Sequence, residues 1–419
     1  NFTAVNEPDV TNFAADTLNY RNNSIKLDDG LSAQNPAALR HPDGTIFTKD
    51  HYFRGGDTVS GVTGFLDFYT ADGYRVQPIA PAVYTAVGAR ETIAELDLLP
   101  GDLRVVSFNV LNYFVTLDGG TSAWICGPSG TMECRGADST LEFDRQRAKL
   151  LDALITIDAD IFGLMEIENE HVGGGDAVAD LVAGLNLALG DGTYAYIQTG
   201  AIGTDAIKQA ILYKPAVVTP VGSFEILDSS VDTRFIDTAN RPVLAQVFAS
   251  TEGGNPFVVA VNHLKSKGSP CTGDPDVFDG SGTCNLTREA AAKALVDWLA
   301  DPTYFPDVEK ALIIGDLNSY DKEAPIDAIK LGADDMADTA DDYLDLIFEN
   351  QGELAYGYVY DGRSGYMDHG LANLAMAENV VDATLWHINA DESDVFDYNA
   401  DSFKPEAQRA LYSVDPYRS

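Results

Sequence analysis

The chain has 419 residues, of which 45% are hydrophobic, and its 27 basic and 65 acidic side chains give a formal net charge of −38. This length fits a large domain with a smaller one, and the hydrophobic share is ordinary for a soluble globular protein. The acidic excess argues against broad attraction to polyanions, because such binding depends on many contacts between phosphates and Lys or Arg. An excess of this kind is typical of a secreted, salt-tolerant protein. Any phosphate-ester substrate must then be held by local basic residues and bound cations.

No apolar run approaches the roughly 18 residues of a membrane-spanning helix, so we expect no membrane span in this chain. Asn1 is not an initiator Met and opens no signal-like apolar stretch, so we expect a mature or trimmed product.

Residues 1–90 are rich in β-branched and aromatic residues and are broken by turn signals. The stretches SIKLDDG and GDTVSGVTGFLDFYTADGYRVQPI read as short strands and hairpins without a strong helical period. We therefore predict a small all-β barrel over residues 1–90 and a linker over residues 91–101.

From Asp102 the pattern changes to strands that are followed either by helices or by further strands. Helices are predicted for STLEFDRQRAKLLDALITI, with a capping box of Ser139 and Glu142, for AVADLVAGLNLAL, and for TREAAAKALVDWLAD, with Thr287 as its cap. Strands are predicted for LRVVSFNV, DIFGLMEIE, QAILYK, PVLAQVFAS, PFVVAVNHL and ALIIGDLN. This order is typical of an α/β protein whose mixed sheets are covered by helices, here over residues 102–419.

Four cysteines form two local pairs in loops rich in Gly, Pro and Asp: Cys126 with Cys134, and Cys271 with Cys284. Neither pair has the tight spacing and His partners of a zinc site. Two loop-closing disulfides in an exported protein are the better interpretation, and four free thiols in a cytosolic protein are the alternative.

Polar side chains that can coordinate a cation or a phosphate stand at the ends of the predicted strands. They are Asn109 in SFNVLNY, Glu166 in LMEIEN, His263 in AVNHLKSK, Asp316 and Asn318 in GDLNS, and Asp368 with His369 in YMDHG. Residues two apart along a strand face the same side, so Asp316 and Asn318 are predicted to point together into one cleft. Acid and amide oxygens suit Mg²⁺ or Ca²⁺, with Mn²⁺ as a further candidate, and not a soft metal.

Each of these motifs taken alone has an ordinary structural explanation. Asp-Leu-Asn is also a common way to begin an Asx turn, and these two interpretations have about equal weight before context. A Glu after a strand is usually a solvated end, and an isolated His263 is more often a satisfied structural histidine. The order of the set along the chain is the specific signal.

That order resembles the endonuclease/exonuclease/phosphatase superfamily, of which deoxyribonuclease I is the best-known type, over roughly residues 102–419. The stretches RGADS, FDRQRAKL, NHLKSKG, GDLNSYDKEAPI and YGYVYDGRSGYMDHGLAN are similar more narrowly to large secreted bacterial nucleases. In those enzymes an OB-fold-like domain precedes the nuclease domain, and GDTVSGVTGFLDFYTADGYRVQP is similar to it. The resemblance implies a four-layer α/β/β/α sandwich of two mixed β-sheets flanked by helices, preceded by a small OB-like barrel.

The resemblance also implies roles for the strand-end residues. Glu166 and Asn109 would hold the divalent cation, and Asp368 would support the network of metal and water. Asp316 would activate or orient the attacking water next to the metal, and Asn318 would hold the phosphate.

His263, with a near-neutral pKa, would protonate the leaving oxygen or bond to the phosphate. Asp205 is a weaker candidate for orienting His263.

Substrate contacts are predicted for basic residues near the cleft: Lys265, Lys267, Arg135 and Arg145. For Arg145 a solvated charge on a helix is an equally weighted alternative. Single-stranded nucleic acid would stack on aromatic residues of the front domain, among Tyr52, Phe53, Phe65, Phe68 and Tyr69, although some of these must be barrel core.

The chain departs from the superfamily pattern at its C-terminal end. The last core strand of that pattern carries a second His directly after an Asp, whereas this chain stops at LYSVDPYRS. We expect the sequence to end just short of this Asp-His pair, and so to lack its last strand. His369 is a candidate replacement that would contact substrate, although its surroundings match the motif of Asp368.

The predicted function is a secreted bacterial, metal-dependent nuclease that hydrolyses phosphodiester bonds of DNA, and also RNA if it is sugar-non-specific, by in-line attack of water. A phosphomonoesterase or another phosphodiesterase of the same superfamily is the first alternative. A catalytically inactive protein that binds nucleic acid or matrix is the second. We expect a monomer.

Overall fold

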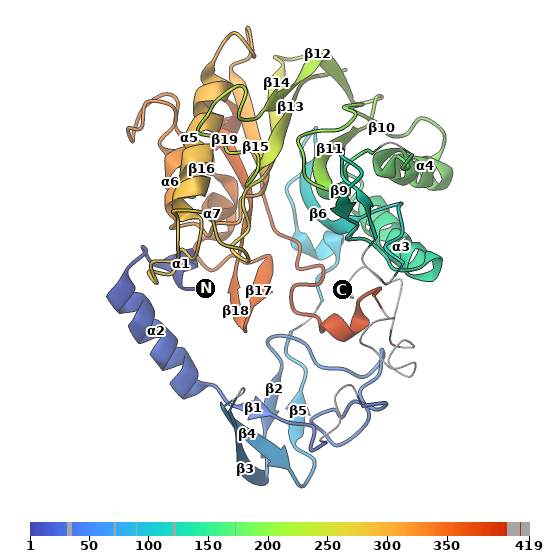
Figure 1. Ribbon diagram of the computed structural model, residues 1–419, viewed down its shortest axis with the longest axis vertical. Helices are drawn as coiled ribbons and strands as arrows, with labels where there is room; N and C mark the ends of the chain where they lie inside the picture. Colours follow the sequence, from blue (N-terminus) through green and yellow to red (C-terminus); the bar gives the residue numbers. More distant parts are fainter. Residues whose placement is uncertain are drawn as a thin grey trace.

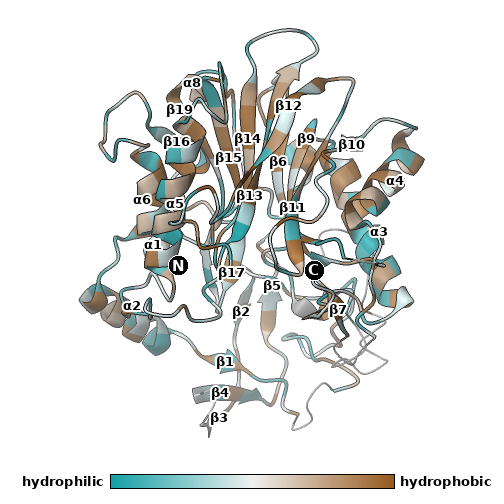
Figure 2. Ribbon diagram, turned by 45° about the horizontal axis from the view of Figure 1, so that its top comes forward, coloured by the Kyte–Doolittle hydropathy of each residue, from teal (hydrophilic) through white to brown (hydrophobic). Residues whose placement is uncertain are grey.

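Two β-sheets lie face to face at the centre of the protein in the computed structural model (Figure 1). The structure describes residues 1–31, 36–70, 73–88, 90–119, 123–171, 173–399 and 411. Buried apolar side chains from both sheets form one cluster between them, with Ile161, Met165 and Ile211 on one side and Val259, Val261, Leu312 and Ile314 on the other. The apolar residues are concentrated on the central strands (Figure 2).

The larger sheet has six strands in the order β12-β13-β14-β15-β19-β16. They are β12 (Val218–Leu227), β13 (Arg241–Ser250), β14 (Phe257–His263), β15 (Lys310–Asp316), β16 (Tyr343–Asp345) and β19 (Asp368–Asn373). Strands β14 and β15 are parallel, and the other neighbours are antiparallel. The sheet is therefore mixed, as predicted.

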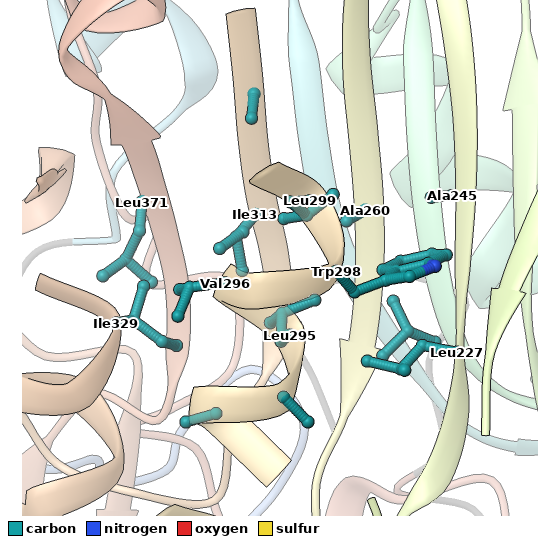
Figure 3. Packing of buried hydrophobic residues seen from close by; sticks show 14 of the residues in the cluster. Leu227, Ala245, Ala260, Leu295, Val296, Trp298, Leu299, Ile313, Ile329 and Leu371 are labelled. Atoms are coloured by element: carbon teal, nitrogen blue, oxygen red, sulfur yellow. The ribbon is translucent and has the colours of Figure 1, made fainter. Parts of the chain in front are cut away.

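Helices α5 (Asn285–Ala300) and α6 (Ala324–Lys330) cover the outer face of this sheet. Leu295, Trp298 and Leu299 of α5 pack toward Ile313 of β15 and neighbouring strands (Figure 3). Shorter helices α7 (Leu346–Gln351) and α8 (Leu374–Ala377) lie next to β19.

The smaller sheet has four strands in the order β10-β11-β9-β6. They are β6 (Val105–Tyr113), β9 (Ile161–Glu168), β10 (Ala195–Tyr196) and β11 (Ile207–Tyr213). Strands β6 and β9 are parallel, and within the described residues β6 is an edge strand. The expected last strand would lie beyond Ser419, outside the described residues, so this expectation stays a prediction.

Helices α3 (Thr140–Ile157) and α4 (Ala177–Leu189) cover the outer face of the smaller sheet. The two sheets approach closely at Gly163, where an added Cβ would lie 2.6 Å from Ile314 Cδ1 and 2.7 Å from Val261 Cγ2. The prediction of a mixed α/β protein with mixed sheets is confirmed.

Local signals explain most helix ends. Ser139 accepts a hydrogen bond from Glu142 N at the start of α3, as predicted, but Glu142 Oε2 accepts from Asp138 N, one residue before the expected partner. Helix α5 begins at Asn285 after Cys284, so Thr287 is not its N-cap. Asp274 Oδ2 instead accepts from the Thr287 amide and hydroxyl, at 2.7 and 2.8 Å. It thus provides a partner for one of the backbone N–H groups in the first turn of the helix.

The front of the chain differs from the all-β expectation. Residues 1–23 contain two helices, α1 (Phe2–Val5) and α2 (Val10–Asn23), and Asp9 caps the second through Asn12 N. Helix α2 has no buried residues, so its apolar period is weak and the sequence pattern missed it.

Strands do follow in the predicted hairpin region: β1 (Lys26–Leu27), β2 (Thr58–Ser60), β3 (Gly64–Tyr69), β4 (Gly73–Pro78) and β5 (Val83–Thr85). Among the described residues they form a sheet β1-β4-β3 and a separate pair β2-β5. Strand β5 lies in the stretch expected to lead into the linker, which itself contains the 3₁₀ helix η1 (Ile93–Leu96). A barrel and the boundary at residue 90 stay predictions.

The first residues of the chain pack against the segment after residue 90, and residues near position 395 pack against the front segment. Thr3 is buried, and its hydroxyl donates to Glu323 Oε1 at 2.7 Å. Near the C-terminal end, the buried carboxylate of Glu392 accepts from Arg54 and Arg90, and Phe396 in the 3₁₀ helix η2 (Asp394–Phe396) stacks on Phe47. The segments before and after residue 90 therefore share buried contacts.

Both predicted disulfides are present, Cys126–Cys134 and Cys271–Cys284. The first joins the short strands β7 (Trp124–Cys126) and β8 (Met132–Glu133) to the loop that follows them. A further hairpin, β17 (Tyr358–Tyr360) with β18 (Arg363–Gly365), precedes β19. Among the described helices, none combines the length and the apolar character that crossing a bilayer requires.

Candidate active site

A row of four polar residues crosses the end of the larger sheet. Arg241 of β13 pairs in register with His263 of β14, His263 with Asp316 of β15, and Asp316 with Asp368 of β19. Residues directly opposite one another project from the same face of a sheet. Asp316 continues the face of Leu312 and Ile314, so the row lies at the rim of the core between the two sheets.

Glu166 faces this row from the smaller sheet. Two residues of β9, Met165 and Glu166, lie opposite the single residue Gln209 of β11, which is a β-bulge. Glu166 has φ +65°, a strained conformation for a residue with a side chain, and strain of this kind costs on the order of 1–3 kcal/mol. The bulge directs the carboxylate toward His263, whose Nε2 lies 3.8 Å from Glu166 Oε1.

Asn109 of β6 completes the opposite side of the site. Its amide nitrogen donates to Glu166 Oε1 at 3.3 Å, and its Oδ1 accepts from Leu111 N at 3.0 Å. Glu166 Oε2 accepts from Asn112 N at 3.1 Å. Leu111 and Asn112 both have φ +52°, so the chain turns here to wrap around the Glu166 carboxylate.

The carboxylates of Glu166, Asp316 and Asp368 therefore lie close enough to interact through their charges. Burial, and then the charge of Asp368, raise the pKa of Asp316 well above its usual range. Burial, and then the charge of Glu166, raise the pKa of Asp368 to about 6. Asp368 Oδ1 is buried and has no hydrogen-bond partner among the described residues. An oxygen-only set of mutually repelling acids with an unsatisfied oxygen fits a hard divalent cation such as Mg²⁺ or Ca²⁺.

His263 is almost fully buried, with 4% of its side chain exposed. Its Nε2 lies 3.8 Å from Asp316 Oδ2 and 3.5 Å from Arg241 Nη1. Burial, followed by the charges of Arg241 and Arg135, lowers the pKa of His263 well below its usual range, in contrast to the near-neutral value expected. In the free protein the imidazole is therefore neutral at pH 7.

Arg241 is the site residue that the sequence did not reveal. Its Nε donates to Asp205 Oδ2 at 3.0 Å, and Asp205 Oδ1 accepts from Arg135 Nη2 at 2.7 Å. Asp205 thus holds two guanidinium groups beside His263 and makes no contact with the imidazole that would orient it directly. The only sequence signal for Arg241 was a charged residue at the start of a largely apolar strand. That signal did not show that Arg241 lies beside His263, which is 22 residues away along the chain.

Asn318 lies next to the row, but for a different reason from the one predicted. Strand β15 ends at Asp316, and Asn318 has φ +49°, so the alternation of side chains along a strand does not apply. The Asx turn is the correct interpretation, because Asn318 N donates to Asp316 Oδ1 at 2.9 Å. The Asn318 amide donates to Leu264 O at 3.1 Å, which joins the ends of β14 and β15.

The two lysines after β14 are engaged with other protein groups. Lys267 forms an ion pair with the buried Glu323 and lies over the ring of Tyr320. Lys265 Nζ donates to Ser266 O at 2.9 Å and to Ser269 Oγ at 2.7 Å. These contacts explain the two lysines structurally, and their predicted grip on phosphate stays untested.

His369 does not reach the row and is withdrawn as a substrate contact. It pairs in register with Gly315, so it projects from the opposite face of the sheet to Asp316 and Asp368. The ring is buried, Nε2 donates to Ser319 O at 2.8 Å, and Nδ1 lies 3.0 Å from Asp345 Oδ2.

Arg145 is half-buried on α3, which fits a fully solvated charge poorly.

The aromatic residues predicted to stack on single strands divide into two groups. Tyr52 and Phe53 contact Phe47, and Tyr52 also contacts Phe396, in a packed aromatic cluster. Phe65, Phe68 and Tyr69 are exposed on β3 and stay candidates.

No protein family profile and no curated protein sequence matches the chain. Solved structures similar to it include the human Nocturnin catalytic domain with bound sulfate, at 16% identity and a TM-score of 0.42, covering 66% of this chain and 84% of that one. An endonuclease/exonuclease/phosphatase family protein from Bacteroides thetaiotaomicron has 18% identity and a TM-score of 0.41, with 65% and 83% covered. D. rerio TDP2 complexed with a single-strand DNA product has 15% identity and a TM-score of 0.37, with 65% and 83% covered. The name of the Bacteroides thetaiotaomicron protein is that of the family that the sequence motifs of this chain resemble.

Proposed function

We propose that the protein is a secreted, metal-dependent phosphodiesterase that hydrolyses DNA. The observation that carries this proposal is the facing arrangement of three carboxylates, a neutral histidine and an anchored arginine at the rim between the two sheets. Each of these elements can serve a need of phosphodiester hydrolysis, in which negative charge develops on the phosphoryl oxygens and the leaving oxygen while water attacks in line.

Glu166 and Asn109 of the smaller sheet and Asp368 of the larger sheet would hold the cation, with Asp316 lying between Asp368 and His263 in the row. When bound, a divalent cation supplies charge neutralisation at the phosphoryl oxygens. The unsatisfied Asp368 Oδ1 and the raised pKa of Asp316 and Asp368 support this assignment, because all three carboxylates carry their charges at low cost only beside a cation.

Asp316 is the residue that orients the attacking water and accepts its proton. Its elevated pKa makes it a stronger base than an exposed aspartate once the carboxylate is ionised. The Asx turn fixes this carboxylate, because Asp316 Oδ1 accepts from Asn318 N and leaves Oδ2 on the side of His263. Asn318 thus positions Asp316.

Arg241 and His263 contact the phosphate in this proposal. Asp205 holds Arg241 by its Nε, so Nη1 remains directed to the space beside His263 Nε2. A phosphodiester bound there brings negative charge that offsets the two guanidinium groups and raises the pKa of His263. His263 then carries the proton that the leaving oxygen needs.

A polymeric DNA substrate is favoured by the two arginines clustered at Asp205 and by the exposed aromatic side chains on β3, which would provide stacking surfaces. The two disulfides support export to an oxidising environment. The phosphomonoesterase alternative keeps the same site and differs only in substrate.

The test is cleavage of supercoiled plasmid with Mg²⁺, Ca²⁺ or Mn²⁺, with and without chelator, beside a phosphomonoester and a small phosphodiester. Metal-dependent plasmid cleavage with no phosphomonoester turnover is the expected result. Preferential turnover of the phosphomonoester would show that the protein is a phosphomonoesterase and that DNA is not its substrate. Binding of DNA without turnover of any substrate would leave the inactive binding protein as the answer.

A further inference from the structure

A second cluster of potential metal ligands lies in the front part of the chain, outside the proposed active site. It consists of His41, Asp43 and His51, each of which offers one ligand atom within 4.8 Å of the others. Asp43 joins the two histidines, with Oδ1 2.9 Å from His41 Nδ1 and Oδ2 2.8 Å from His51 Nε2. The two imidazole rings are 4.0 Å apart between their centroids.

The loop holds these three side chains in place. Asp43 Oδ1 also accepts from Thr45 N at 3.0 Å and from Thr45 Oγ1 at 2.6 Å, and His41 N donates to Thr45 O. These bonds orient the carboxylate and leave Oδ2 with His51. Hydrogen bonds to a carboxylate from its surroundings are the usual support of a metal ligand.

His41 is the buried member of the cluster. Its side chain is fully buried, yet Nε2 has no hydrogen-bond partner among the described residues. The ring is packed edge-on against Tyr84, so solvent does not satisfy this nitrogen. Nδ1 is the ring nitrogen that faces Asp43, so it is the atom that would coordinate the ion, and burial of the ring keeps it in that position.

We propose that His41, Asp43 and His51 bind a borderline transition-metal cation, with Zn²⁺ as the preferred ion, at a structural site separate from the phosphoesterase cleft. Two imidazoles with one carboxylate are a donor set for such ions, whereas the all-oxygen cleft suits a hard cation. In tetrahedral zinc geometry, bonds of about 2.0–2.1 Å place the ligand atoms about 3.3 Å apart, so the observed contacts need only a small expansion.

Binding of the ion would replace the direct contacts that now join the two histidines to Asp43. Each imidazole must present a lone pair to the ion, so a proton on the coordinating nitrogen moves to the other ring nitrogen, and at acidic pH H⁺ competes with the cation and lowers its affinity. His51 has 44% of its side chain exposed, which gives the ion a path of entry. The bound ion would link His41 and His51 and so close the loop between them.

The test uses the full chain after treatment with chelator and dialysis. Co²⁺ titration followed by visible absorption, and Zn²⁺ titration by calorimetry, should show one imidazole-containing site per chain. His51→Ala should weaken Zn²⁺ binding by about 100-fold or more, above the 10–100-fold typical of losing an outer-shell partner. Because His51 is exposed, this variant is expected to fold, and Asp43→Asn gives a second measurement.

Two control variants separate this site from the proposed active site. His387→Ala removes a histidine that stacks on Tyr356 and pairs with Glu91, and it should leave Co²⁺ and Zn²⁺ binding unchanged. Glu166→Gln should abolish metal-dependent hydrolysis but keep the Co²⁺ spectrum. Equal Zn²⁺ affinity in the wild type and His51→Ala would overturn the proposal, whatever the outcome of the nuclease assays.

Discussion

Glu166 has the most direct role in the proposed chemistry, because its carboxylate faces His263 from the opposite sheet and is held by Asn109 and Asn112. Glu166→Gln keeps the shape and removes the charge. We expect hydrolysis to fall by at least about 10²-fold at saturating metal, because the cation loses its main anionic ligand. Thermal unfolding should change little in chelator, where the loss of charge relieves repulsion with Asp316 and Asp368.

Glu170→Gln is the matched control for this substitution. Glu170 follows the same strand but pairs with Lys208 at 3.1 Å, away from the row. Plasmid cleavage should be unaffected by it. Normal cleavage by Glu166→Gln would show that the metal assignment is wrong.

The raised pKa of Asp368 predicts how the metal-free protein responds to pH. A carboxyl whose pKa is higher in the folded state, here about 6 against an ordinary value of 3.8, stabilises the fold at acidic pH. This contribution is complete below about pH 4 and is lost as the pH rises through about 6. In chelator the melting temperature should therefore decrease between pH 5 and pH 7, and a saturating divalent cation should reduce this decrease.

Asp368→Asn tests the same point without a change of pH. The neutral amide should stabilise the metal-free protein at pH 7, by on the order of 1–2 kcal/mol, while abolishing hydrolysis. Calorimetry in chelator measures the first effect and plasmid cleavage the second. A lower melting temperature for this variant at pH 7 would contradict the raised pKa.

Arg241 is predicted to contact phosphate, whereas Lys267 is held by Glu323. Arg241→Ala should lower kcat by about 10²–10³-fold, the range seen when one donor to a transition-state oxygen is removed. Arg234→Ala is the control, because Arg234 is a half-exposed arginine paired with Asp232 and Asp297. If Lys267→Ala reduced cleavage as strongly as Arg241→Ala, without loss of stability, the lysine would regain its predicted role.

At the scale of elements, the active site depends on where strands end and on how the following loops are tied. Arg288 of α5 is fully buried and donates to Ser319 Oγ at 3.0 Å and to Thr283 O at 2.8 Å. It also donates to Lys265 O at 3.3 Å, one residue after the carbonyl that holds Asn318. The loops after β14 and β15 are therefore fixed from the helix side.

The Cys271–Cys284 bond belongs to the same loop system, because Cys284 is the residue before α5. Thiol titration of the denatured, unreduced protein should find almost no free thiol. Closing a loop of this length should stabilise the fold by about 3 kcal/mol, so Cys271→Ser with Cys284→Ser should lower the melting temperature. Four titratable thiols in the unreduced protein would contradict both disulfides and weaken the argument for secretion.

At the scale of the whole molecule, Glu392 connects the front segment with the C-terminal part of the described chain. Its buried carboxylate accepts from Arg54 Nε at 3.1 Å and from Arg90 Nε at 2.8 Å. Glu392→Ala leaves two guanidinium groups without this partner, which should cost about 3–5 kcal/mol. Limited proteolysis should then cut the front segment first, while Glu378→Ala, at an exposed position, should have no such effect.

Much of the architecture follows from patterns within a few residues of each other. Apolar runs and helical periods predict the strands β6, β9, β11, β13, β14 and β15 and the helices α3, α4 and α5, because burial of a face imposes its period on the local sequence. The same local order places Glu166, His263, Asp316 and Asp368 at strand ends. The short loops between cysteines likewise predict their pairing. Helix α2 escapes such patterns because it buries no face that would impose a period.

Only the tertiary structure decides which of these strand ends meet. Strand register places Arg241 beside His263 and Asp316 beside Asp368. Lys267, a candidate for phosphate by sequence, is paired with Glu323 at a distance of 56 residues along the chain. Register and buried ion pairs depend on groups that are far apart in sequence and become neighbours only when the sheets stack. Local periodicity carries no information about how the sheets stack. The residues around the proposed cation could therefore be named from the sequence, whereas Arg241 could not.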